Sequence, residues 1–220
     1  MSIYDISCQF IQDQAIFGAY PTQEHIQFLE EWGVDVIVNL TYDDEKRIKL
    51  YTVNDNVEVI RFPIPDRSVP QNKQMFSALI LFLKAKIDDA KKIYIHCKAG
   101  HGRAGIVASA LLCHHLKVTP SKAIEITSTQ HATRKNMKQR WRVVGSPQTF
   151  DQKKFIKSIF REHVLCETSP LTAIDIDNLP TDPYLEEFLM QTYLGEISGP
   201  NSDKLKRYRE SLFAVKYPFF

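Results

Sequence analysis

The chain has 220 residues, which is enough for one sizeable domain and a smaller appendage. Hydrophobic residues make up 44% and charged residues 25%, as in ordinary globular proteins, and a formal net charge of +2 gives no general field for nucleic acid. Four cysteines without metal-ligand spacing indicate no metal site and are typical of a reducing compartment. Because no apolar stretch can span a bilayer and no signal peptide is evident, we expect a cytoplasmic protein without a transmembrane segment.

The first half of the chain alternates short strands with helices. One or two short strands are expected within 1–18. Three further strands, at segments rich in β-branched residues, are expected over 34–40, 57–62 and 93–95. A helix over 23–32 is capped by Thr22 and stopped by Gly33, and an amphipathic helix runs through 75–87. This alternation predicts an α/β fold with a central, mostly parallel sheet flanked by helices on both faces.

Three more helices are predicted after the last strand. An apolar helix covers 104–113, and another starts with Thr119 as its cap and Pro120 as its first residue. The third runs from Ser146-Pro147 to about residue 163. In sheets of this kind, ligands bind at the carboxyl ends of the central strands, so we expect the functional loop directly after the strand at 93–95.

The character of the sequence changes near its end. We therefore predict a first domain over 1–165 and a proline-punctuated C-terminal extension over 166–220. Two short helices are expected in the extension, near 183–194 and 202–213. The first has an apolar face, which must dock on the first domain, pair with another subunit or bind a partner.

The segment 93–105 passes from a buried strand through a tight loop to a helix N-terminus. This order builds an anion cradle, because loop N–H groups point into one concavity and the helix dipole adds partial positive charge. Gly100 and Gly102 allow the backbone conformations that such a loop needs. We expect this field to favour the thiolate form of Cys97. Arg103 can hold two phosphate oxygens, so the segment indicates a nucleophile directed at phosphorus.

His96-Cys97, followed by five residues and Arg103, resembles the signature loop of the cysteine-based protein tyrosine and dual-specificity phosphatases. With two further motifs, the resemblance covers residues 14–163 and implies that family's fold, without a metal or cofactor. It makes Cys97 the nucleophile and His96 a structural hydrogen-bonding residue beneath the loop. The implied phosphate-binding residues are Lys98, Ala99, Gly100, His101, Gly102 and Arg103.

The second motif is the proline-bounded loop 62–70, which resembles the mobile general-acid loop of the same superfamily. A phosphate ester departs poorly unless its leaving oxygen is protonated, and the resemblance makes Asp66 the acid, with Arg67 in support. Prolines stiffen the loop so that it can move as one piece. Taken alone, these residues favour an ordinary exposed turn.

The third motif, at residues 148–152, is similar to the glutamine-containing segment that positions the hydrolytic water in tyrosine phosphatases. By this resemblance Gln148 orients the water and Gln152 supports it. Without the resemblance, the segment is simply a polar helix start.

Ala104 departs from the family pattern, in which a Ser or Thr usually follows the arginine. In the family, that hydroxyl donates to the cysteine sulfur and helps to expel it when the phosphoenzyme hydrolyses. Alanine lacks the donor, so we expect a phosphocysteine intermediate that breaks down slowly. A similar alanine occurs in the phosphatases of regenerating liver.

The substrate class stays open between phosphoproteins and anionic lipid headgroups. Phosphotyrosine is favoured, with phosphoserine and phosphothreonine as further substrates, because the acid loop resembles the protein-phosphatase version. Lys98 and His101 as extra basic positions favour a phosphoinositide or inositol phosphate instead, and Ala104 favours a low-turnover phosphate-binding scaffold. A basic cluster is either a solvated loop or a docking patch for acidic peptides or anionic lipid surfaces; its members are Arg134, Lys135, Lys138, Arg140 and Arg142.

Overall fold

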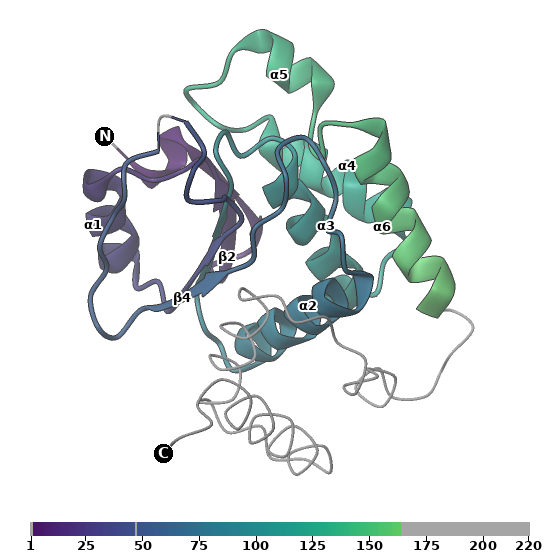
Figure 1. Ribbon diagram of the computed structural model, residues 1–220, viewed down its shortest axis with the longest axis horizontal. Coiled ribbons are helices and arrows are strands. Elements are labelled where there is room, and N and C mark those ends of the chain that lie inside the picture. Colours follow the sequence, from purple (N-terminus) through teal and green to yellow (C-terminus); the bar gives the residue numbers. More distant parts are fainter. Residues whose placement is uncertain (1, 47, 164–220) are drawn as a thin grey trace, which may run out of the picture. The chain divides into compact units, whose positions relative to one another are not determined.

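A computed structural model of the chain describes residues 2–46 and 48–163 (Figure 1). Its centre is a five-stranded sheet with the order β1-β2-β5-β3-β4. The strands are β1 (Ser7–Ile11), β2 (Ala15–Gly18), β3 (Val36–Asn39), β4 (Glu58–Arg61) and β5 (Ile93–His96). Only β1 and β2 pair antiparallel, so the expected mostly parallel sheet is confirmed, with β5 at its centre.

Helices lie on both sides of the sheet (Figure 1). They are η1 (Ile3–Asp5), α1 (Gln23–Trp32), α2 (Lys73–Asp88), α3 (Arg103–Leu116), α4 (Pro120–His131), α5 (Gln139–Val144) and α6 (Phe150–His163). On one face, Ile26 and Leu29 of α1 pack against Ile37 of β3 and Tyr94 of β5. On the other face, the apolar helix α3 packs against β2 and β5, and α2, α4 and α6 surround it. The buried helix α3 therefore begins directly behind the loop that leaves the central strand.

Local sequence signals place several helix ends where they were expected. Thr22 Oγ1 accepts a hydrogen bond from the backbone N–H of His25 at 3.3 Å at the start of α1. Gly33 ends that helix with a φ of +84°, a conformation that glycine adopts without steric cost. Thr119 caps α4 in the same manner, accepting from the N–H of Lys122 at 3.3 Å.

The helix expected from Ser146-Pro147 begins later, at Phe150, so that boundary was wrong. Thr149 and Gln152 form a reciprocal cap there. The N–H of Gln152 donates to Thr149 Oγ1 at 3.2 Å, and the N–H of Thr149 donates to Gln152 Oε1 at 3.1 Å. Such a capping box fixes the first turn three residues downstream of the proline. The short helix α5, which precedes this turn, was not expected.

The domain boundary expected at 165/166 and both expected helices of the extension lie outside the described residues. Within residues 2–46 and 48–163, none of the helices has the length and apolar character that a bilayer span requires.

Candidate active site

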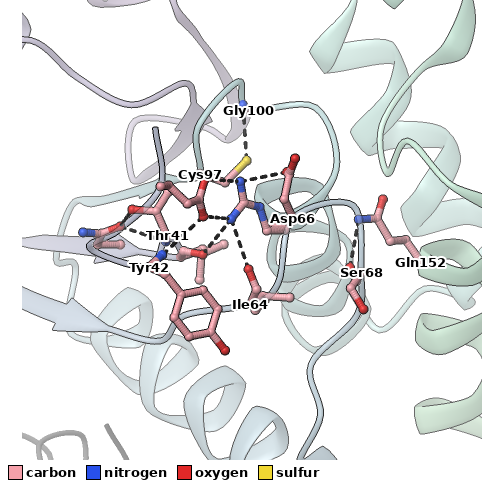
Figure 2. Close-up of polar contacts among 12 residues, drawn as sticks. Thr41, Tyr42, Ile64, Asp66, Ser68, Cys97, Gly100 and Gln152 are labelled. Carbon is pink, nitrogen blue, oxygen red and sulfur yellow. Dashed lines mark hydrogen bonds and ion pairs between the residues drawn. The ribbon is translucent and has the colours of Figure 1, made fainter. Parts of the chain in front are cut away.

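The loop between β5 and α3 holds the expected nucleophile. Cys97 directly follows β5, is 3% exposed, and its Sγ atom accepts a hydrogen bond from the N–H of Gly100 at 3.2 Å (Figure 2). Gly100 has a φ of +68°, and a Cβ atom there would lie 2.3 Å from the carbonyl carbon of Gly18. Only glycine fits such a position. The chain therefore curls over the sulfur at the carboxyl end of the central strand.

Arg103, the first residue of α3, is 2% exposed and contacts the loops that follow β3 and β4. Both carboxylate oxygens of Glu45 accept from its guanidinium, with an Nη2–Oε2 distance of 3.0 Å. Nη1 also donates to the carbonyl oxygens of Ile64 at 3.1 Å and Leu40 at 3.4 Å. Burial opposes the charge, but the hydrogen bonds and charge of Glu45 raise the pKa of Arg103 above its ordinary value. Arg103 is thus a charged group held in one orientation.

Asp66 reaches the same guanidinium from the loop after β4. Its Oδ1 atom lies 3.0 Å from Nη2 of Arg103, and its side chain is 64% exposed (Figure 2). A carboxylate that is mostly in solvent can exchange this partner without disturbing the core. Arg67 follows with a φ of +61° and is exposed. The structure therefore brings Asp66 to the expected arginine and leaves Arg67 at the surface.

Glu45 was not among the expected site residues, yet it holds Arg103 with both carboxylate oxygens. Its side chain is 13% exposed, whereas the neighbouring Asp43 and Asp44 are exposed. In the sequence it stands within a run of charged residues, which is typical of a solvated segment. No local signal separates Glu45 from its neighbours, so only the fold reveals its contact.

His96 lies beneath the loop as a buried, neutral residue. Its Nε2 atom is 2.7 Å from the hydroxyl of Tyr51, and the ring of Tyr20 packs edge-on against the imidazole with a centroid distance of 4.9 Å. Burial lowers the pKa of His96 to about 3 and raises the pKa of Tyr51, so both side chains are neutral at pH 7 and share one hydrogen bond. This arrangement suits a structural hydrogen-bonding residue better than a base at neutral pH.

Of the two glutamines in the third motif, Gln152 is the one that reaches the loop. It is fully buried, and its Nε2 atom donates to the carbonyl oxygen of Ser68 at 3.0 Å (Figure 2). A Cβ atom on Gly102 would lie 2.8 Å from both its amide nitrogen and its amide oxygen. Gln152 therefore joins the acid loop to the phosphate-binding loop. Gln148 is half-buried in the turn before α6, and its role as the water-orienting amide stays a prediction.

Arg134 supports the phosphate-binding loop, although the sequence placed it in a solvated or docking cluster. It is 3% exposed, so for this residue both of those interpretations are wrong. Nη1 donates to the carbonyl oxygen of Ala99 at 3.3 Å, and Nη2 donates to those of Gly100 at 2.6 Å and Phe17 at 3.2 Å. In a trans peptide the C=O and N–H groups point in opposite directions. Holding the carbonyl of Ala99 therefore directs the next N–H, that of Gly100, toward the sulfur of Cys97.

His101, expected as an extra basic position, is neutral in this fold. Its Nδ1 atom lies 2.8 Å from Nε2 of His131, and its ring stacks on Trp141 with a centroid distance of 4.9 Å. Burial, followed by the charges of Arg134 and Arg140, lowers the pKa of His101 to about 4. The loop thus gains no cation from this residue at pH 7.

The remaining expected residues at the loop are Lys98, Ala99 and Ala104. Lys98 is half-buried and Ala99 is exposed, while Ala104 is fully buried in the first turn of α3. The buried Ala104 places no hydroxyl in that turn. Within the loop, Lys98 therefore supplies a positive charge in addition to that of Arg103.

Residues 9–156 match the family described as the DSP-PTPase phosphatase domain of Swiss Army Knife proteins. The chain belongs to this phosphatase family. The signature loop and its two flanking motifs had indicated the same superfamily.

Two viral relatives of the chain carry tyrosine phosphatase names. The 197R protein of Invertebrate iridescent virus 6 is 42% identical over 121 residues, and the 067L protein of Invertebrate iridescent virus 3 is 35% identical over 161 residues. These matches cover 54% and 71% of the present chain. They cover 46% and 66% of the relatives, so the chain spans less than two thirds of the length of either protein.

Solved structures share the fold of the chain. Tk-PTP in its active form superimposes with a TM-score of 0.58 at 21% identity, over 70% of this chain and 96% of that one. PTPMT1 in complex with PI(5)P gives a TM-score of 0.54 at 20% identity, over 71% and 97% of the two chains. At these identities the likeness establishes the common architecture and leaves the substrate to be argued from the site.

Proposed function

We propose that this protein is a phosphoprotein phosphatase that acts through a phosphocysteine, with phosphotyrosine as the leading substrate. One observation carries the proposal: Asp66 meets Arg103 at 3.0 Å at the rim of the loop whose floor is the Cys97 sulfur. A nucleophile, an oxyanion-binding cation and a proton donor are the groups that cleavage of a phosphate monoester requires.

In the first step the Cys97 thiolate attacks phosphorus in line, forming the S–P bond as the P–O ester bond breaks. The phosphoryl oxygens displace the Asp66 carboxylate from Nη2 of Arg103, because both anions compete for the same cation. Asp66, now facing a dianion, holds the proton that passes to the leaving oxygen. Glu45 keeps the guanidinium in place throughout, because it binds from within the protein.

In the second step water attacks the phosphocysteine, its proton goes to Asp66, and the S–P bond breaks to release phosphate and the thiolate. The buried amide of Gln152 contacts both the acid loop and the phosphate-binding loop, and this position supports a role in orienting the water. Ala104 offers no hydroxyl to the departing sulfur, and this absence supports slow breakdown of the intermediate.

Phosphotyrosine, with phosphoserine and phosphothreonine as further substrates, is favoured by the charge of the loop. A multiply phosphorylated inositol headgroup needs several cations, and the neutral His101 removes one that the sequence had suggested. Lys98 and the shared fold of PTPMT1, solved with PI(5)P, keep a phosphoinositide as the alternative substrate. A low-turnover phosphate-binding scaffold, suggested by Ala104, is the second alternative.

The test compares a phosphopeptide panel with a phosphoinositide panel. Wild-type protein should hydrolyse phosphotyrosine peptides fastest, Cys97→Ser should hydrolyse nothing, and Asp66→Ala should lose ~10²–10⁴-fold in kcat. Asp44→Ala, which removes an exposed acid from another loop, serves as the matched control and should keep wild-type rates.

Two results would redirect the assignment. Faster hydrolysis of the inositol panel would replace the phosphoprotein substrate with a lipid. Tight phosphopeptide binding without turnover would favour the scaffold. In an active enzyme, Ala104→Ser should reduce the phosphocysteine trapped by rapid acid quench. An unchanged amount of intermediate would discard slow breakdown.

A further inference from the structure

We propose that the surface beside the phosphate-binding loop docks on an anionic lipid bilayer. This surface, called the α5 rim below, consists of Lys135, Lys138, Arg140, Val143 and Phe150. It belongs to a stretch, residues 126–150, that contains five Lys or Arg residues and no Asp or Glu. The proposal concerns where the protein acts and does not depend on which phosphate ester it cleaves.

Two members of the basic cluster bind backbone carbonyl groups of the protein, and the other three are exposed to solvent. Arg134 is buried on backbone carbonyls, and Arg142 donates to the carbonyl oxygens of Ala132, Arg134 and Lys135. These contacts hold the segment in one shape. The three cations of the rim are exposed, and no ion pair within residues 2–46 and 48–163 involves them.

Apolar side chains accompany these cations. Val143 is 78% exposed and Phe150 is 79% exposed, and the neighbouring Val144 is 40% exposed. Exposed hydrophobic side chains that gather on one part of a surface mark interaction sites more often than single ones do. The rim thus combines two exposed lysines and Arg140, whose guanidinium lies 4.6 Å from the Trp141 ring centroid, with two largely exposed apolar groups.

The rim lies next to the reaction centre. Trp141, two residues before Val143, stacks on His101 of the phosphate-binding loop. Gln152, two residues after Phe150, is in contact with Gly102 of the same loop. Figure 1 shows α5 and the first turn of α6 at the same end of the described domain. A bilayer bound there would lie beside the phosphate-binding loop.

The combination of side chains selects a lipid surface among the anionic partners. An acidic peptide would neutralise the cations but leave Val143 and Phe150 in water. A second copy of the chain at the same patch would bring like charges together, which is unfavourable. A bilayer with anionic headgroups accepts both kinds of side chain, since cations stay among the headgroups and apolar groups enter the acyl boundary.

The test measures sedimentation of the full chain with two kinds of vesicle: phosphatidylcholine alone, and phosphatidylcholine with roughly a third phosphatidylserine. Each basic residue near such a membrane contributes about fivefold in affinity, so Lys135→Ala combined with Lys138→Ala should weaken binding to the anionic vesicles by ~25-fold. Phe150→Ser should weaken it as well.

A matched control replaces two exposed lysines that are already paired. Lys91 binds Asp35 and Lys122 binds Glu125, so Lys91→Ala with Lys122→Ala changes the net charge equally but should keep most of the affinity. The two double-lysine variants should hydrolyse a soluble phosphate ester at the wild-type rate and unfold at the wild-type temperature.

Two results would overturn the proposal. One is equal binding of wild type and the Lys135/Lys138 variant to the anionic vesicles. The other is binding of wild type to polyglutamate without binding to either vesicle, which would identify an acidic peptide as the partner. Failure of either kind leaves hydrolysis of phosphopeptides untouched, so it is distinguishable from failure of the proposed function.

Discussion

Arg134 offers the sharpest test of how the phosphate-binding loop is held open. The change is Arg134→Met, which keeps the length and apolar stem of the side chain and removes the guanidinium. In the wild type that group satisfies the carbonyl oxygens of Phe17, Ala99 and Gly100. Without the guanidinium, the peptide plane between Ala99 and Gly100 can flip. The N–H of Gly100 then no longer points toward the Cys97 sulfur.

The size of the effect follows from these contacts. A hydrogen bond to a charged group contributes about 1.5–3 kcal/mol, and a carbonyl left buried without a partner costs ~1–3 kcal/mol. Water can reach part of the emptied site, so we expect a loss of about 2–4 kcal/mol in the free energy of unfolding. Misorientation of one loop N–H should weaken binding of inorganic phosphate by ~10–100-fold, which corresponds to about 1.4–2.8 kcal/mol.

The assay is competitive inhibition by inorganic phosphate, measured beside urea unfolding. Arg134→Lys keeps the charge but cannot reach three carbonyls from one amine, so it should fall between wild type and Arg134→Met. Lys135→Met removes a charge from the adjacent exposed position and should leave both quantities unchanged. If Arg134→Met is destabilised yet binds phosphate as tightly as wild type, Arg134 serves the fold alone and the reasoning about the loop is refuted.

Two further predictions concern protons and water. Burial lowers the pKa values of His96 and His131 to about 3 and of His101 to about 4, so only the unfolded chain takes up protons as the pH falls below about 6.5. The free energy of unfolding should therefore be highest above that pH and should fall toward pH 4, by up to ~1.4 kcal/mol per pH unit for each of the three histidines. Measured by urea unfolding, His131→Gln should show a shallower fall with pH. A slope equal to that of the wild type would contradict this prediction. In rapid-quench experiments Gln152→Ala should slow phosphocysteine hydrolysis more than Gln148→Ala does, and the reverse order would restore the role predicted from the motif.

The features that the sequence predicted well are those whose causes are local. Thr22 and Gly33 delimit α1 because a cap and a left-handed turn act within a few residues. The loop after β5 was recognisable because strand, glycines and helix start follow one another directly. Thr149 and Gln152 also provide a local signal, although the predicted helix start did not use it. Their spacing is a capping-box signal that places the start of α6 at Phe150, three residues after the proline at which the helix was expected to begin.

What the sequence could not provide are the partners that the fold brings from far along the chain. Glu45 lies 58 residues before Arg103, and Arg134 lies 35 residues after Ala99. Neither differs in type from its charged neighbours, and burial alone separates Glu45 from Asp44 or Arg134 from Lys135. A buried charge persists only where the fold supplies enough partners for it. The same basic cluster therefore contains a residue that shapes the catalytic loop and residues that remain available for a partner, and burial decides which is which.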